Sequence, residues 1–335
     1  MNELKSVIES LCPGDTSHDV LHLGRMASGQ PLTVPFTVVR GDSMSPCLWV
    51  NAAVHGNEIP SSISAVLFAR RLRDMRLRGS VVVTPVANPT AVDSRTKHSP
   101  YDGVDLDQSF PGREMLLTDR VAERVFEAVA PVASVAVNLH TMSTFMDAAR
   151  YCVYKTPPDD RVSEKTLLEL ASCFTPFVVC RMSLGGEGEL PGRIAGALDY
   201  QMLSLGKPAF MAELGGGGVW DEAMVDEAVE SLIRLARVCG VLDPDEVRKP
   251  TQLLRVLART HVTGSEGGFF RGLARPGTRI KAGTVLGQTI DVRGETAQKF
   301  RVDDEVAVIG VRRDPLVHPG DRIGFVGLEW DEVVV

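Results

Sequence analysis

Over most of the chain, short runs of apolar residues alternate with segments whose apolar positions recur at helical spacing. The apolar runs predict buried strands at 36–40, 47–54, 80–88, 132–140, 176–180 and 207–214. The helical spacing predicts helices at 63–75, 119–129, 163–173, 193–205 and 221–239. Strands that alternate with helices in this way are typical of an α/β fold. We therefore expect a mixed, largely parallel sheet flanked by helices.

The pattern changes after a charged segment with two prolines at 242–251. Beyond it, short β-type segments are punctuated by glycine, which predicts a small all-β domain. We expect a catalytic domain at 1–245 and a C-terminal β domain at 252–335. The second domain is of ordinary domain size, and we expect it to act as a lid over the site or as an oligomer contact.

Composition narrows the classes of function. The chain has 335 residues and a formal net charge of -7, with its basic residues scattered, which argues against nucleic acid or an anionic membrane as the main partner. No apolar run of about 20 residues is present, as a transmembrane helix would need. The six cysteines form no CxxC motif, and the N-terminus has no continuous apolar segment typical of a signal peptide. This pattern indicates reduced thiols in a cytoplasmic protein.

Three predicted strands end in a titratable side chain. His55 follows the strand at 47–54, His140 closes the strand at 132–140, and Glu213 lies near the end of the strand at 207–214. Ligands of open α/β sheets bind outside the carboxyl ends of strands, so these groups should converge.

The spacing of His55 and Glu58 alone is weak support for a metal site, because Asn57 or Ser61 could cap a helix that has Glu58 in its first turn. Together with His140, however, these residues give the ligand set of a hydrolytic zinc site, two histidines and a carboxylate. Such a site also needs a second carboxylate that moves protons, and Glu213 is the candidate.

Five motifs occur in an order and spacing that resemble one known family. They are HGNE (55–58), ANPTA (87–91), DLDQSFPGR (105–113), NLHT (138–141) and AELGGGG (212–218). The resemblance is to the succinylglutamate desuccinylase/aspartoacylase family of zinc-carboxypeptidase-like amide hydrolases. ELGGGG and the SPYDG segment look most like its bacterial N-acyl-amino-acid deacylase branch, which includes N-α-acetyl-diaminobutyrate deacetylase. The C-terminal segment is similar to the β domain of these proteins.

The resemblance implies that His55, Glu58 and His140 bind one Zn²⁺ ion per chain and that Glu213 is the general base and acid. The family also has an arginine, in the loop after ANP, that stabilises the oxyanion of the tetrahedral intermediate. Here the matching position is Lys97, with Arg95 two residues earlier. The sequence leaves open which of the two serves.

The chain departs from the family at two places. Asp107 and Gln108 replace an Asn-Arg pair that grips a substrate carboxylate. Either another arginine has taken over and Asp107 holds a loop, or the substrate offers an amine or amide to Asp107 and Gln108; we favour the second slightly. The other departure is Asn138, where the family often has Asp, and we expect a moderately weaker metal affinity from the loss of that carboxylate. The replacement arginine of the first alternative would be Arg113, Arg150 or Arg193.

We therefore expect a zinc-dependent amidohydrolase that removes an acyl group from a small N-acylated amine or amino-acid derivative. Two alternatives stay open: a metallocarboxypeptidase-like peptide hydrolase, and a non-catalytic protein that binds a metal or small molecule. Another divalent cation in place of zinc, and assembly into a homo-oligomer, stay open as well.

Overall fold

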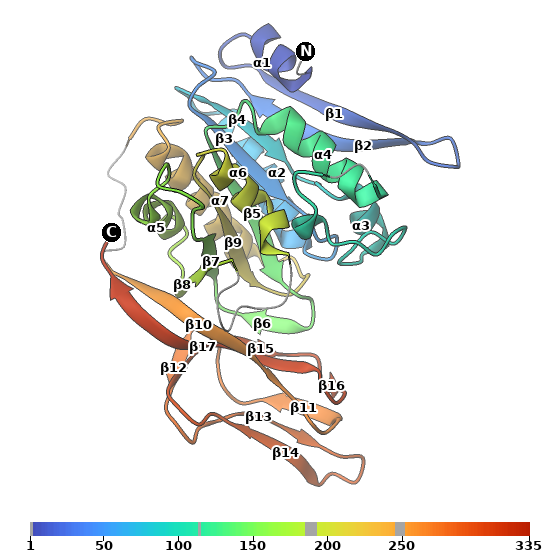
Figure 1. Cartoon of the computed structure of the whole chain (residues 1–335), viewed down its shortest axis with the longest axis vertical. Coiled ribbons are helices and arrows are strands. Elements are labelled where there is room, and N and C mark those ends of the chain that lie inside the picture. The colour runs from blue at the N-terminus through green and yellow to red at the C-terminus, as the bar shows by residue number, and fades with distance from the viewer. Residues whose placement is uncertain (1–2, 113–114, 185–192, 245–251) are drawn as a thin grey trace.

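The computed structural model describes residues 3–112, 115–184, 193–244 and 252–335. At the N-terminal edge, the short helix α1 (Glu3–Ser10) precedes an antiparallel pair of strands, β1 (Thr16–Arg25) and β2 (Pro31–Val39). Figure 1 shows this pair extending beyond the helices as a long hairpin. Strand β1 was not predicted from the sequence, because its polar and apolar residues give it no continuous apolar run.

The centre of the molecule is a mixed sheet. Its strands lie in the order β1-β2-β4-β3-β5-β9-β7-β8, and the sheet then continues into the C-terminal part of the chain. The pairs β3–β4, β3–β5, β5–β9 and β7–β8 are parallel, whereas β7 runs antiparallel to β9. The predicted fold class is therefore confirmed. The central strands are β3 (Cys47–Ala52), β4 (Ser80–Thr84), β5 (Val135–Met142), β7 (Tyr151–Lys155), β8 (Val178–Met182) and β9 (Ala209–Gly216).

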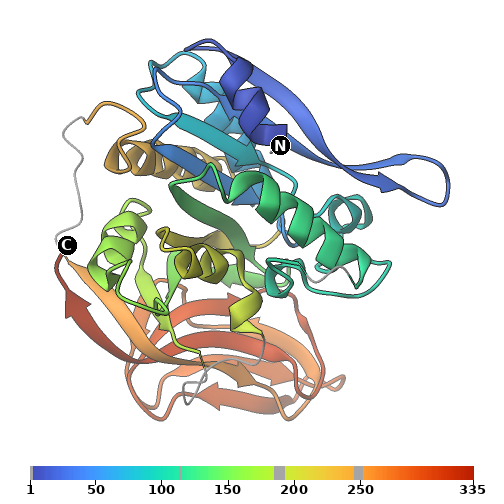
Figure 2. The same ribbon diagram turned by 45° about the horizontal axis from the view of Figure 1, so that its top comes forward.

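Helices cover both faces of this sheet (Figure 1, Figure 2). Along β3, Leu48 and Val50 belong to the core beneath one layer of helices and Trp49 to the core beneath the other, because successive strand residues point to opposite faces. Burial on both sides explains why these strands are apolar throughout. One layer holds α2 (Ile59–Leu72), α5 (Glu164–Ser172) and α7 (Glu222–Val238), and the other holds α1, α4 (Leu117–Val129) and α6 (Leu198–Ser204).

The C-terminal strands both extend the central sheet and form a second one. β10 (Leu253–Thr263) pairs in parallel with β8, and the order continues through β17 (Arg322–Val333) and β15 (Val306–Arg312) to β12 (Thr278–Ile280). The second sheet shares a separate apolar core with β15 and β17 and lies farthest from the N-terminal hairpin (Figure 1). Its order is β14 (Thr296–Arg301), β13 (Val285–Ile290), β11 (Gly268–Gly272) and β16 (Leu316–Val317). The predicted boundary between the domains falls largely at 245–251, outside the described residues.

The remaining elements lie in loops around the sheet. The stretch at 89–111, which has little periodicity, contains α3 (Pro89–Ser94) and the short helix η1 (Leu106–Gln108). The helix predicted at 193–205 is interrupted, with η2 (Ile194–Gly196) followed by α6. Strand β6 (Met146–Ala148) pairs with β15 and so joins the central region to the C-terminal strands. Among the described helices, none has both the length and the apolar character needed to cross a membrane.

Candidate metal centre and active site

The loop after β3 brings His55 and Glu58 to the carboxyl end of the sheet. Gly56 lies so close to α3 that a Cβ atom there would be 2.0 Å from the backbone carbon of Ala91. A side chain at this position is therefore excluded, and the segment that follows α3 can pack beside the histidine. Helix α2 begins at Ile59 with Glu58 at its N-cap position. The cap that Asn57 or Ser61 could provide is not formed: Asn57 Oδ1 has no partner among the described residues, and the Ser61 hydroxyl donates to the Glu58 carbonyl.

Glu58 instead directs its carboxylate at the two histidines. Nδ1 of His55 lies 2.8 Å from Oε1, and Nδ1 of His140 lies 3.0 Å from Oε2, which also accepts a hydrogen bond from the backbone N–H of Thr141. All three side chains are buried, and one ligand atom from each lies within 4.8 Å of the others. Burial opposes protonation of His55, but the negative charge of Glu58 and hydrogen bonds to Asp105 and Glu58 raise its pKa to about 10. The site therefore favours positive charge.

The far side of His55 is held by Asp105, whose Oδ1 lies 3.0 Å from Nε2. Burial opposes ionisation of Asp105, yet the hydrogen bond and charge of His55 hold its pKa below the ordinary value. A carboxylate in this position fixes the ring of a metal-binding histidine and leaves the other nitrogen for the metal. Asp105 belongs to the DLDQSFPGR motif, but nothing in the sequence alone indicates that it contacts His55.

Asp107 and Gln108 both have partners within the protein. Asn138 donates a hydrogen bond to Asp107 Oδ1 at 2.9 Å, and the same oxygen lies 3.9 Å from Nε2 of His140. Gln108 donates to Asp105 at 3.1 Å and accepts from the backbone N–H of Arg193 at 2.8 Å. Burial raises the pKa of Asp107. The hypothesis that these two side chains contact a substrate amine stays a prediction.

Glu213 lies beside the proposed ligands on the next strand. It is the register partner of His140 across β5 and β9, and of Tyr151 across β9 and β7. Its Oε2 is buried and has no hydrogen-bond partner among the described residues. Burial and the negative charge of Glu58 together raise the pKa of Glu213 to about 7. A buried carboxylate with this pKa can accept and release a proton near neutral pH.

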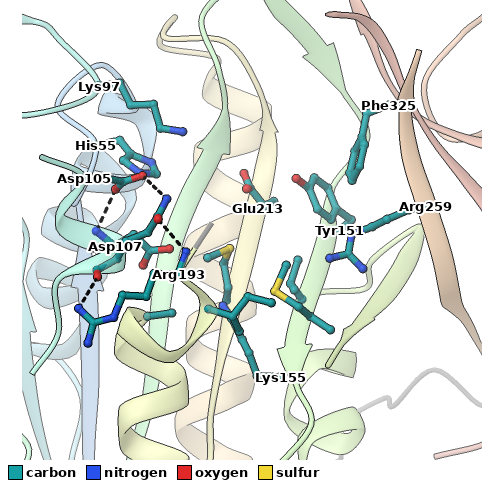
Figure 3. Close-up of a pocket in the computed structure, with 16 residues that line it drawn as sticks. His55, Lys97, Asp105, Asp107, Tyr151, Lys155, Arg193, Glu213, Arg259 and Phe325 are labelled. Carbon is teal, nitrogen blue, oxygen red and sulfur yellow. Dashed lines mark hydrogen bonds and ion pairs between the residues drawn. The ribbon is translucent and has the colours of Figure 1, made fainter. Parts of the chain in front are cut away.

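A cavity of about 210 Å³ is lined by His55, Asp105, Asp107, Gln108 and Glu213 (Figure 3). The cavity is bounded by His55, Lys97 and Asp105 on one side and by Tyr151 and the C-terminal strands on the other. Apolar side chains line much of the remainder. They are Val153, Met182, Ile194, Ala197, Met211 and Phe325.

The candidate cations differ in position. Lys97 and Arg193 line the cavity. Arg95 ends α3 in the left-handed conformation and is absent from the lining of this cavity, as is Arg150, which lies 3.4 Å from Glu227. Arg113 lies outside the described residues.

Several lining residues had no role in the sequence analysis. Lys155 is buried in an ion pair with Asp199 at 2.8 Å. Tyr151 and Lys155 come from β7, which was not predicted as a strand, whereas Arg259 and Phe325 come from β10 and β17. His261 lines an adjoining cavity with Phe325. These residues reach the cavity because strands that are distant in the sequence pair with each other, and local periodicity does not reveal that pairing.

The chain is similar to known proteins in both sequence and fold. Residues 45–239 match the model of the succinylglutamate desuccinylase/aspartoacylase catalytic domain. N-α-acetyl-L-2,4-diaminobutyric acid deacetylase from Halomonas elongata is 26% identical over 304 residues, which cover 88% of this chain and 85% of that protein.

Solved structures share the fold over nearly the whole chain. The product-bound ectoine utilization protein EutE (DoeB) from Ruegeria pomeroyi aligns with a TM-score of 0.80 and 21% identity, covering 95% of this chain and 97% of that one. A succinylglutamate desuccinylase from a Silicibacter species aligns with a TM-score of 0.79 and 19% identity, covering 96% and 97%. Since the matched catalytic domain accounts for more than half of the residues, the chain belongs to the succinylglutamate desuccinylase/aspartoacylase family.

Proposed function

We propose that this protein is a zinc-dependent amidohydrolase that removes an acyl group from a small N-acylated amine or amino-acid derivative. The observation that carries the proposal is the convergence of His55, Glu58 and His140 beside Glu213, with His55 and Glu213 at the wall of one cavity. Membership of the family supports hydrolysis of an amide bond. The name of the Halomonas relative, a deacetylase, supports a small acyl group.

The three proposed ligands fit a zinc ion by the chemistry of their donor atoms. Two imidazole nitrogens and a carboxylate oxygen make a set that leaves a further position for water or substrate. The carboxylates of Glu58 and Asp105, at 2.8 and 3.0 Å from the His55 ring nitrogens, favour positive charge there. A bound zinc ion would polarise the scissile carbonyl and lower the pKa of a water molecule. Because such donors also accept other divalent cations, zinc as the native metal is part of the proposal.

We assign Glu213 the role of general base and then general acid. As a carboxylate it takes a proton from the attacking water, and as a carboxylic acid it returns that proton to the departing amine nitrogen. The pKa of about 7 suits both steps. Glu213 lines the cavity, and its buried Oε2 has no hydrogen-bond partner within the described part of the chain, so no protein donor competes for this oxygen.

Lys97 is the cation that we propose for the oxyanion of the tetrahedral intermediate. It lines the cavity beside His55, where the oxyanion would form, whereas Arg95 does not line that cavity. A fixed positive charge at this place stabilises the transition state more than the neutral carbonyl of the substrate.

For a substrate carboxylate we assign Arg193, because it lines the cavity and Arg150 does not. Its Nη1 donates to the backbone carbonyl of Gln108 at 3.4 Å. Arg259 and Phe325 add the C-terminal strands to the substrate wall, which supports a role for the segment at 252–335 in closing the site. A cytoplasmic location and a homo-oligomer stay predictions.

The test begins with the purified protein and its metal content. Removal of the metal with a chelator should abolish release of free amine from N-acylated amines and amino acids, and added Zn²⁺ should restore it. Glu213→Gln should retain zinc and lose about 10²- to 10⁴-fold in kcat, because it removes proton transfer but not a ligand. Full activity in the presence of the chelator would contradict the proposal.

Peptide substrates, added to the same assays, separate the two alternative functions. A metallocarboxypeptidase-like enzyme would cleave C-terminal residues from peptides faster than it cleaves N-acetyl groups from single amino acids. A non-catalytic binding protein would hold zinc and show no hydrolysis that Glu213→Gln could reduce.

A further inference from the structure

A chain of buried hydrogen bonds crosses three neighbouring strands and ends beside the metal centre. The Trp49 indole N–H donates to Thr84 Oγ1 at 3.0 Å, and the Thr84 hydroxyl donates to Asn51 Oδ1 at 2.5 Å. Asn51 Nδ2 then donates to Asn138 Oδ1 at 2.9 Å, and Asn138 Nδ2 donates to Asp107 Oδ1 at 2.9 Å. Asn51 is the register partner of both Thr84 and Asn138, so the sheet itself brings the three polar side chains together.

The direction of this chain is fixed by chemistry at both ends. An indole N–H can only donate a hydrogen bond, and a carboxyl oxygen that carries no proton can only accept one. Each intermediate group must therefore accept from the Trp49 side and donate toward Asp107. Asn138 cannot reverse its amide without placing two donors or two acceptors against each other, and burial makes such a mismatch costly. Its NH₂ group consequently points at Nε2 of His140, 2.8 Å away.

That orientation matters when Nδ1 of His140 binds a metal. A neutral imidazole whose Nδ1 is a ligand carries its hydrogen on Nε2 and needs an acceptor there. The Asn138 NH₂ group cannot accept. The acceptor that the structure places beside Nε2 is Asp107 Oδ1, at 3.9 Å, and the Asn138 hydrogen bond holds it in position. A displacement of about 1 Å would bring it to hydrogen-bond distance.

Asp105 has the corresponding place beside the other histidine. It lies 3.0 Å from Nε2 of His55, so the segment Asp105-Leu106-Asp107 presents one carboxylate to each histidine. Neighbouring segments hold it firmly. Gln108 bonds to Asp105 and to the backbone of Arg193, and a Cβ atom at Gly196 would be 2.0 Å from the Gln108 carbonyl oxygen.

We propose that Asp107 is a positioning residue for the metal ligand His140 and not a contact to substrate. The inference rests on the metal site of the proposed function. Where the family often has Asp, this chain has Asn138 and so lacks a carboxylate. Asp107, two residues after the Asp105 that contacts His55, supplies a carboxylate instead. The moderate loss of metal affinity expected from Asn138 alone is therefore offset.

An exchange of the two side chains gives the sharpest test. In the double variant Asp107→Asn/Asn138→Asp, the new carboxylate at 138 can accept from Asn51 with one oxygen and from His140 Nε2–H with the other. The new amide at 107 can donate to it. Net charge and side-chain size are nearly unchanged, and every group in the chain keeps a partner.

Zinc affinity, measured by competition with a chromophoric chelator, is the primary readout for wild type, Asp107→Ala, Asp107→Asn and the double variant. We expect each single variant to bind zinc about 10- to 100-fold more weakly, as is usual for the loss of a group that supports a metal ligand. The double variant should return to within about threefold of wild type on the same scale. At saturating zinc, KM for an N-acetylated substrate should be unchanged in all of them. Asp93→Asn, an exposed acid on α3, is the control for the loss of one negative charge.

Two results would overturn the assignment. One is unchanged zinc affinity in the single variants together with a raised KM, which would make Asp107 a substrate contact. The other is a folded double variant, judged by circular dichroism, that binds zinc as weakly as the single variants. A wild-type protein that binds no zinc would contradict the proposed function itself, so the two failures are distinguishable.

Discussion

The two walls of the cavity are built in different ways. The wall with the proposed metal ligands comes from the carboxyl ends of parallel strands, where β3, β5 and β9 deliver His55, His140 and Glu213. The opposite wall comes from β7 and from C-terminal strands, with Tyr151, Lys155, Arg259 and Phe325 among its residues. The side chains that meet at the carboxyl ends of parallel strands follow from the order of strands and helices along the chain. The side chains that meet on the opposite wall depend on which strands, distant in the sequence, pair with each other.

On the wall built from β7 and the C-terminal strands, the largest expected effect is the loss of stability when the ion pair between Lys155 and Asp199 is broken. Both side chains are almost completely buried, and Nζ lies 2.8 Å from Oδ2. Lys155→Met leaves the Asp199 carboxylate buried without its partner, so we expect the free energy of unfolding to fall by about 3–5 kcal/mol. Denaturant unfolding, followed by circular dichroism, measures this free energy in the variant and in wild type.

The matched control is the double variant Lys155→Met/Asp199→Leu, which removes both charges. It should be clearly more stable than Lys155→Met alone, because no uncompensated charge stays buried. Equal stability of the two variants would show that the pair is not what supports this wall.

On the wall with the proposed metal ligands, Lys97→Ala should reduce kcat about 10²- to 10³-fold, the usual effect of removing a group that stabilises an oxyanion. KM should change little, because the ground-state carbonyl carries no full charge. Arg95→Ala is the control from the same loop, and steady-state kinetics on an N-acetylated amino acid compares them. A larger loss in Arg95→Ala than in Lys97→Ala would reverse the assignment.

Arg193 tests whether the substrate carries a carboxylate. Arg193→Ala removes the guanidinium but keeps the backbone N–H that donates to Gln108. Loss of a charged hydrogen bond of about 1.5–3 kcal/mol should raise KM roughly 10- to 100-fold for an acyl-amino acid, and much less for its decarboxylated analogue. Arg150→Ala, whose guanidinium faces Glu227, is the control. An equal rise in KM for both substrates would argue against a carboxylate at Arg193.

The convergence of His55, His140 and Glu213 could be predicted from the sequence because the signals for it are local. His55, His140 and Glu213 each follow an apolar run, and the parallel arrangement that unites them follows from alternating strands and helices. The alternation predicted the central strands and helices well. It did not predict β1 or β7, or the continuation of the sheet from β8 into β10, because pairing between distant segments leaves no local periodicity.

Asp105 and Asp107 show the same limit within one motif. Their separation by a single residue gives no sign that each carboxylate approaches a different histidine, since that depends on how η1 packs against η2 and β5. The sequence did identify Asp107 as a departure from its family. The proposal that this carboxylate serves His140 rests on the hydrogen-bond chain from Trp49, which the sequence does not reveal.

The pH dependence of kcat/KM gives the smallest expected effect. The pKa of Glu213 is raised from its ordinary 4.5 to about 7, first by burial and then by the charge of Glu58. Since the base must be ionised, activity is present above this pKa and lost as the pH falls through it. The positive charge of a bound metal favours the carboxylate, so we expect the acidic limb between 4.5 and 7. Below it, kcat/KM should fall about tenfold per pH unit. The residual activity of Glu213→Gln should lack this limb, and an unchanged limb in that variant would assign the titration to another group.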